Sequence, residues 1–169
     1  MVSQKAVEQE YAEAQINLAY YYKEGKGGLQ ESYTEAAKWY RKAAEQEYAK
    51  AQFWLALCYE EGKGVPQDDE EAARWYRKSA EQGGDSAQLS LGLSYRLGRG
   101  VPKNDEKAAS WYRMAAEQGN QFGQVCLGQC YENGIGVPKD LKKAVQWYQK
   151  AAAQGNEDAI KKLRELNVR

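Results

Sequence analysis

The side chains that could carry out catalysis in this 169-residue chain are few. There is no histidine, which is both the side chain best suited to acid–base catalysis near neutral pH and the commonest metal ligand. Serine, aspartate and glutamate remain, but their spacing pairs no nucleophile with a base, and Asp68 and Asp69 are explained by helix capping. The sequence therefore predicts no catalytic site and no enzymatic activity.

The three cysteines, Cys58, Cys126 and Cys130, lie in segments that we expect to be helical. Because Cys126 and Cys130 are four residues apart, they would lie on adjacent turns of one helix and could in principle share a soft metal ion. Two ligands are few for such a site, and free, mostly buried thiols are the better interpretation. We therefore expect no metal and no cofactor, and the free thiols favour a reducing compartment.

Glycine-rich turns are a second feature that could bind a ligand, because such turns can cradle phosphate groups. The chain has four of them: Gly25-x-Gly27, Gly62-x-Gly64, Gly98-x-Gly100 and Gly134-x-Gly136. Phosphate-binding glycines follow a strand and precede a helix, whereas these follow an expected helix, and the last three continue into Val-Pro. We interpret them as helix ends that need a positive φ.

Charge and hydropathy exclude two classes of partner. Lys plus Arg and Asp plus Glu both number 24, so no excess positive charge is available to neutralise nucleic-acid phosphates. Arg41, Arg77 and Arg113 each have a glutamate four residues later, which predicts ion pairs on a solvated helix face. No apolar run approaches the roughly 18 residues of a membrane span, and the N-terminus lacks a signal-like region. We expect no nucleic acid, no membrane span and a cytoplasmic location.

A repeat of 36 residues must position all of these side chains. The pair Trp-Tyr recurs at Trp39-Tyr40, Trp75-Tyr76, Trp111-Tyr112 and Trp147-Tyr148. Each repeat carries two apolar stripes of helical spacing, the first at residues such as Ala14, Leu18 and Tyr22, and the second around the Trp-Tyr pair. The sequence therefore predicts stacked helix pairs, here called helix A and helix B. Residues suited to cap helix B also recur, at Ser32, Asp68, Asn104 and Asp140.

The repeat pattern resembles a known family. Residues 87–102 read A-x-x-x-L-G-x-x-Y-x-x-G-x-G-V-P, and residues 108–119 read A-x-x-W-Y-x-x-A-A-E-Q-G. This pattern resembles the Sel-1-like repeats, relatives of the tetratricopeptide repeats, over residues 11–166. The resemblance implies an all-α fold, an α/α superhelical solenoid that serves as a scaffold or adaptor, with helix A lining a concave side where peptides or other proteins bind. The paired cysteines of the secreted branch and the charged carboxylate clamp of some tetratricopeptide domains are absent from this chain.

We expect a single repeat domain over residues 1–169. Residues 1–10 are interpreted as the remnant of a preceding helix B, because residues 5–15 nearly duplicate residues 42–52. Four complete helix pairs follow, at 11–47, 48–83, 84–119 and 120–155. Residues 156–169 are expected to form a capping helix that has one apolar side and is otherwise charged.

Recognition is expected at the helix A positions that vary between repeats, since the constant positions are needed to build the frame. The predicted partner-binding residues on the concave face are Ile16, Tyr20, Phe53, Trp54, Leu57, Leu89, Leu93, Arg96, Val125 and Gln129. An alternative for Ile16, Phe53, Leu89 and Val125 is that they pack helix A against its neighbour. Trp54 is the one tryptophan outside the repeated pair, and it would either anchor a partner or fill a gap between repeats.

The sequence therefore favours a non-catalytic protein–protein interaction scaffold that binds a peptide or protein segment on the helix A face. The alternative is an excised or engineered structural solenoid that self-associates through its exposed end repeat.

Overall fold

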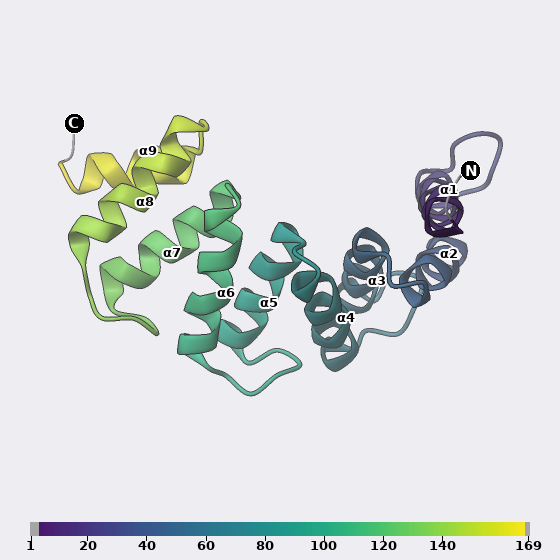
Figure 1. The fold of residues 1–169 in the computed structure, drawn as a ribbon, viewed down its shortest axis with the longest axis horizontal. Coiled ribbons are helices and arrows are strands. Elements are labelled where there is room, and N and C mark those ends of the chain that lie inside the picture. The colour runs from purple at the N-terminus through teal and green to yellow at the C-terminus, as the bar shows by residue number, and fades with distance from the viewer. Residues whose placement is uncertain (1–3, 168–169) are drawn as a thin grey trace. The chain divides into compact units, whose positions relative to one another are not determined.

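The computed structural model describes the backbone of residues 4–167 and the side chains of residues 11–167. Within this range the chain forms nine α-helices and no strand, which confirms the predicted all-α class (Figure 1). The helices are α1 (Gln4–Glu24), α2 (Tyr33–Glu45), α3 (Ala49–Glu61), α4 (Asp69–Glu81), α5 (Asp85–Leu97), α6 (Asp105–Glu117), α7 (Gln121–Asn133), α8 (Leu141–Ala153) and α9 (Glu157–Glu165).

The helices group into two compact units, the first ending at Gly84 and the second beginning at Asp85. Within each unit every helix packs against the next one along the chain, so α1 to α4 form one stack and α5 to α9 another. The helices α1, α3, α5 and α7 correspond to the predicted helix A, and α2, α4, α6 and α8 to helix B. The centre of each stack consists of repeated residues, among them Leu55 and Leu91 of helix A and Tyr76 and Tyr148 of helix B, all nearly inaccessible to solvent.

The predicted caps of helix B are confirmed. The side chains of Ser32, Asp68, Asn104 and Asp140 each accept a hydrogen bond from the backbone N–H three residues further on. This bond satisfies one of the free N–H groups at the start of each helix, which explains why a short polar residue recurs there.

The Gly-x-Gly turns end helix A, and their second glycine also allows a close approach between repeats. Gly62 and Gly134 take left-handed φ angles of 65° and 71° at the ends of α3 and α7. A Cβ atom at Gly64 would lie 2.0 Å from the carbonyl oxygen of Tyr33, at the start of α2, and one at Gly136 would lie 1.9 Å from that of Asp105, at the start of α6. No residue other than glycine fits there without a shift of the backbone.

Glutamine pairs join helix A to helix B within each repeat, a feature that we did not predict from the sequence; the helix A glutamine of each pair is buried. The side-chain amide of the glutamine that ends each helix B donates to the side-chain oxygen of a helix A glutamine at 2.7–2.9 Å. The donor and acceptor pairs are Gln46 with Gln15, Gln82 with Gln52, Gln118 with Gln88 and Gln154 with Gln124. The sequence signal for these pairs was the recurrence of both glutamines at the repeat period.

Residues 4–10 differ from the sequence-based expectation, because they form the first turns of α1 rather than a separate helix. The near-identical segment at residues 42–52 is instead broken between α2 and α3, where Glu47 takes a left-handed φ of 60°. Later repeats have a glycine at this position, with φ between 85° and 93°. Tertiary packing therefore decides whether this sequence bends, since the local propensities are nearly the same.

At the other end of the chain, α9 follows the second unit's last helix B. Its N-cap Asn156 accepts from the N–H of Ala159, which is fully buried. Ile160, Leu163 and Leu166 are half-buried, whereas Glu157 and Lys161 are exposed. The described part of α9 thus has one packed side and one charged side, as we predicted for this segment.

Candidate functional site

The ten predicted partner-binding residues all lie on helix A elements, α1, α3, α5 and α7, but they differ in exposure. Ile16 and Val125 are only 6% and 7% exposed, so these two pack in the core, as the alternative interpretation holds. Tyr20 and Leu93 are 43% and 41% exposed. The remaining six are half-buried: Phe53, Trp54, Leu57, Leu89, Arg96 and Gln129.

In the first unit a cavity of about 130 Å³ lies beside two of the predicted residues, Trp54 and Leu57. It is lined by the end of α1, by α2, by α3 and by the loop that follows α3. The residues that line it are Lys23, Tyr33, Ala36, Tyr40, Trp54, Leu57, Cys58, Glu61 and Lys63. We call it the Trp54 cavity.

Aromatic packing fixes Trp54 in place. Its ring stacks on Tyr40, with centroids 6.0 Å apart and planes at 17°, and meets the edge of Phe53 at 5.6 Å. The ammonium group of Lys23 lies 5.4 Å from the centroid of the same ring. Trp54 therefore packs from α3 against α1 and α2 and also lines the cavity. This geometry is compatible both with a partner anchor and with a residue that fills a gap between repeats.

The charged residues that line the Trp54 cavity are Lys23, Lys63 and Glu61. Lys63 pairs with Glu61 at 2.7 Å, and this hydrogen bond raises the pKa of the exposed Lys63 ammonium. Lys23 lies 3.6 Å from Glu24. Each lysine thus has a carboxylate beside it.

The cysteines are poorly suited to chemistry. Burial raises the pKa of the Cys58, Cys126 and Cys130 thiols to about 11, so all three are protonated near neutral pH, when they are weak nucleophiles. All three are free, as we predicted. Among the described residues no group of three or more His, Cys, Asp or Glu side chains is placed to hold a metal ion.

In the second unit the helix A surface is apolar along α5. Leu89, Leu93 and Leu97 follow one another at intervals of four residues, and Leu97 is 56% exposed. Arg96 lies beside this stripe, with its Nε atom 3.7 Å from a carboxylate oxygen of Asp105. Exposed apolar side chains in such a row are typical of contact surfaces.

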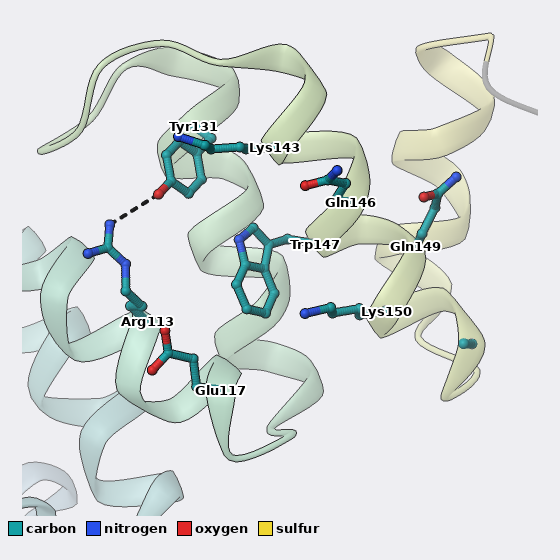
Figure 2. A pocket seen from close by; sticks show the side chains of 9 residues that line it. Arg113, Glu117, Tyr131, Lys143, Gln146, Trp147, Gln149 and Lys150 are labelled. Carbon is teal, nitrogen blue, oxygen red and sulfur yellow. Dashed lines mark hydrogen bonds between the residues drawn. The ribbon is translucent and has the colours of Figure 1, made fainter.

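The helix B surface carries a second depression, of about 630 Å³, between α6, α7 and α8 (Figure 2). The residues that line it are Arg113, Glu117, Tyr131, Lys143, Gln146, Trp147, Gln149, Lys150 and Ala153. We call it the Trp147 hollow. We did not predict it from the sequence, although Gln149 and Ala153 replace an arginine and a glutamate that the other three repeats share.

The ion pairs predicted for the helix B arginines are wrong for Arg41 and Arg113. Arg41 donates to the hydroxyl oxygen of Tyr59, and Arg113 donates to that of Tyr131 at 3.1 Å. Within the part of the chain that the structure describes, no salt bridge joins either arginine to the glutamate four residues later. The arginines instead tie helix B to the repeated tyrosine of the next helix A.

No helix within residues 4–167 is both long and apolar enough to cross a membrane.

Comparison with known proteins identifies the repeat. The family model described as the Sel1 repeat matches residues 12–48, 49–84, 85–120 and 123–156. No curated protein matches the chain significantly.

Solved structures of similar proteins share the fold. A protective antigen of uropathogenic Escherichia coli with an SLR fold is 40% identical with a TM-score of 0.88, over 96% of this chain and 36% of its own. A Sel1 repeat protein from Oxalobacter formigenes is 41% identical with a TM-score of 0.83, over 93% of this chain and 63% of its own. Cysteine-rich protein B of Helicobacter pylori is 29% identical with a TM-score of 0.61, over 79% of this chain and 96% of its own.

This chain thus spans less than two thirds of the first two proteins. The predicted fold class, an all-α superhelical repeat solenoid, is confirmed. The chain belongs to the Sel1 repeat family.

Proposed function

We propose that this chain is a non-catalytic protein-interaction module that binds a peptide or protein segment on its helix A face. Sel1 repeat proteins are generally protein-interaction scaffolds, which supports the class of function. The observation that carries the proposal for this chain is the Trp54 cavity, where a tryptophan outside the repeat pattern lines an apolar hollow with lysines beside it.

The size of the Trp54 cavity suits one side chain of a partner. Its volume of about 130 Å³ is well below the roughly 300–1,000 Å³ of sites that enclose a whole small molecule. The aromatic rings of Tyr40 and Trp54 favour an apolar or aromatic side chain as the anchor. Because Lys23 and Lys63 already have carboxylate neighbours, they contribute to orientation and specificity more than to affinity.

The stripe of Leu89, Leu93 and Leu97 is the matching apolar surface of the second unit. It lies on the same helix type and supports recognition on the helix A face there too. Tyr20 adds an exposed aromatic side chain in the first unit. The cytoplasmic location remains a prediction.

The test is a selection of peptides from a display library on the immobilised chain, followed by calorimetry with the selected peptide. Trp54→Ala is expected to weaken binding at least tenfold while circular dichroism shows a cooperatively folded chain. The neighbouring Leu55→Ala, which removes a fully buried repeated side chain, is expected to act on stability instead, by about 2–5 kcal/mol.

Lys42→Gln is the matched surface control, since Lys42 lies over Trp39 on helix B of the same unit. A large fall in melting temperature for Trp54→Ala, with unchanged affinity, would show that Trp54 packs the helices and does not anchor a partner.

A second candidate function, self-association through an end repeat, is favoured by the exposure of α1. Ala14 is exposed and Leu18 is half-buried, whereas the equivalent Ala51 and Leu55 of α3 are fully buried under the preceding helix B. Light scattering over a hundredfold range of concentration tests this. A constant monomer mass rejects self-association, and a mass that rises with concentration supports it.

A further inference from the structure

The Trp147 hollow lies outside the helix A face and has a different chemistry. Arg113 and Glu117 reach it from α6, Tyr131 from α7, and the lysines and Trp147 from α8 (Figure 2). All of these helices belong to the second unit. The hollow therefore depends on the packing of consecutive helices within one stack.

The equivalent place in the repeat of residues 48–83 is closed, whereas Trp39 of the first repeat is half-buried as Trp147 is. In that repeat Trp75 is only 4% exposed, and Arg74 and Lys78 lie over its ring at 5.5 Å and 4.7 Å. Arg74 is held in turn by Glu71 at 3.1 Å. Trp147 is half-buried and has one cation over its ring, Lys150, at 4.0 Å.

The difference follows from substitutions at equivalent positions, 72 residues apart. The second unit has Lys143, Gln146, Gln149 and Ala153 where the first has Glu71, Arg74, Arg77 and Glu81. Two carboxylates are lost in this exchange, and one arginine that covers the tryptophan becomes a shorter glutamine. The same substitutions therefore leave Trp147 less covered and remove acidic side chains from its surroundings.

The cations that remain are incompletely neutralised. Lys143 pairs with Asp140 at 3.4 Å. Among the described residues, however, no carboxylate lies within 4.0 Å of the charged groups of Arg113 or Lys150. Arg113 uses one Nη atom for the Tyr131 hydroxyl and keeps further N–H donors for another acceptor. Glu117 is the one carboxylate among the lining residues, against three cations.

We infer that the Trp147 hollow binds an acidic segment of a partner protein, with carboxylates on Arg113 and Lys150 and an apolar side chain against the exposed part of Trp147. The planar guanidinium of Arg113 matches a carboxylate through two parallel hydrogen bonds. A polynucleotide fits less well, since the balanced charge of the whole chain offers no extended row of cations for successive phosphates. This site is additional to the proposed helix A face and does not depend on it.

The five tryptophan indole N–H groups provide the test, because each gives one signal in a ¹H–¹⁵N spectrum that a Trp→Phe variant assigns. The probes are a blocked hexapeptide in which glutamate alternates with phenylalanine, the same peptide with glutamine for glutamate, and a short uridine-rich RNA. The acidic peptide is expected to shift the Trp147 signal, less so at high salt. The glutamine peptide is expected to shift it at least tenfold less at equal concentration.

Arg113→Gln and Lys150→Gln are each expected to weaken binding of the acidic peptide about tenfold. Lys42→Gln removes the corresponding lysine over Trp39 in the first unit and is expected to leave the affinity unchanged. Thermal melting checks that each variant folds. If Arg113→Gln does not fold, Lys150→Gln alone tests the inference, because Lys150 is exposed.

Three outcomes would overturn the inference. They are no shift of Trp147 at millimolar acidic peptide, equal shifts with both peptides, and a stronger response to the RNA than to the acidic peptide.

Discussion

Trp75 and Trp147 occupy the same position in two repeats, yet one is closed over and the other lies open. Both project from a helix B that begins with an aspartate cap and packs through the next residue, Tyr76 or Tyr148, into the core. Around Trp75, charged side chains cover the ring, whereas around Trp147 they leave a hollow of about 630 Å³. The repeat frame therefore does not determine the surface that it carries.

Two sets of residues thus act separately in this chain. Residues that recur at the repeat period, such as Leu55, Tyr76 and Gln88, are buried and hold helices together. Residues that vary, such as Trp54 and Lys143, lie at the surface or line a hollow. Substitutions in the first set should break the shared frame, and substitutions in the second should change only the surfaces placed on it.

The largest effect is expected from the glycines that allow repeats to approach. Gly64→Ala and Gly136→Ala each place a Cβ atom within about 2 Å of a backbone carbonyl oxygen, at a left-handed φ. We expect each to cost about 3 kcal/mol or more of unfolding free energy, measured by urea denaturation.

Gly27→Ala is the control for that experiment, because Gly27 has a similar φ of 65° but nothing lies within 4 Å of the position that an alanine Cβ atom would take. It should cost about 1 kcal/mol, from the backbone conformation alone. An equal loss for Gly27→Ala and Gly64→Ala would show that the close approach between repeats is unimportant.

Alkaline pH should distinguish the two units. In the second unit burial raises the pKa of Cys126 and Cys130 to about 11 and also raises the pKa of Tyr112 and Tyr148. In the first unit it raises the pKa of Cys58 to about 11 and that of Tyr40 to about 12. The unfolded chain loses these protons at lower pH than the folded chain does. The stability they contribute is therefore complete below about pH 8, falls once the unfolded thiols begin to lose protons, and is lost as pH rises through the folded values.

We expect urea stability to be level from pH 7 to about pH 8 and to fall above that, with hydrogen exchange increasing first in α7 and α8. Equal loss of protection in both units, or stability that is unchanged at pH 11, would contradict this expectation.

Exchanging the surface residues between the repeats should exchange their properties. Lys143→Glu with Gln146→Arg rebuilds the first unit's residues around Trp147. We expect the Trp147 indole to become protected from acrylamide quenching and binding of the acidic peptide to fall at least tenfold, while the unfolding free energy changes by less than about 1 kcal/mol. The reverse change, Glu71→Lys with Arg74→Gln, should expose Trp75. If both tryptophans keep their original accessibility, the covering side chains are not the cause.

The smallest effect is expected from Trp75→Phe. The Trp75 indole N–H is buried, and within the described residues it has no hydrogen-bond partner, so its removal loses no bond. We expect a change of no more than about 1 kcal/mol, the ring being replaced by a smaller one. A loss of about 3 kcal/mol in thermal unfolding would indicate an acceptor or a packing role that the geometry does not show.

The helix pairs and their caps could be predicted from the sequence because their signals are local and repeated. Asp68 caps α4 through a bond to a backbone group three residues away, and Gly62 ends α3 through its own φ. Neither feature depends on a distant side chain. The glutamine pairs were equally regular, but their partners lie 30 or 31 residues apart, and only the packed helices bring them together.

The surfaces could not be predicted as fully, since they depend on which neighbour a long side chain contacts. Arg113 bonds to Tyr131 rather than to Glu117, although helix spacing favours the glutamate. Val125 is buried and Leu93 is exposed on equivalent kinds of helix, a difference that needs the packed neighbours. The segment around residue 10 is a third case. It is helical there, whereas the near-identical segment at residues 42–52 bends at Glu47.

The most direct test of the proposed function is to locate a selected peptide on the isotope-labelled chain by its chemical-shift changes. We predict that the largest shifts fall on residues that line the Trp54 cavity, with the Trp54 indole N–H first among them and the Trp39 indole N–H unchanged. Shifts that fall instead on the helix B surface of α2 and α4, with the Trp54 indole signal unchanged, would contradict recognition on the helix A face.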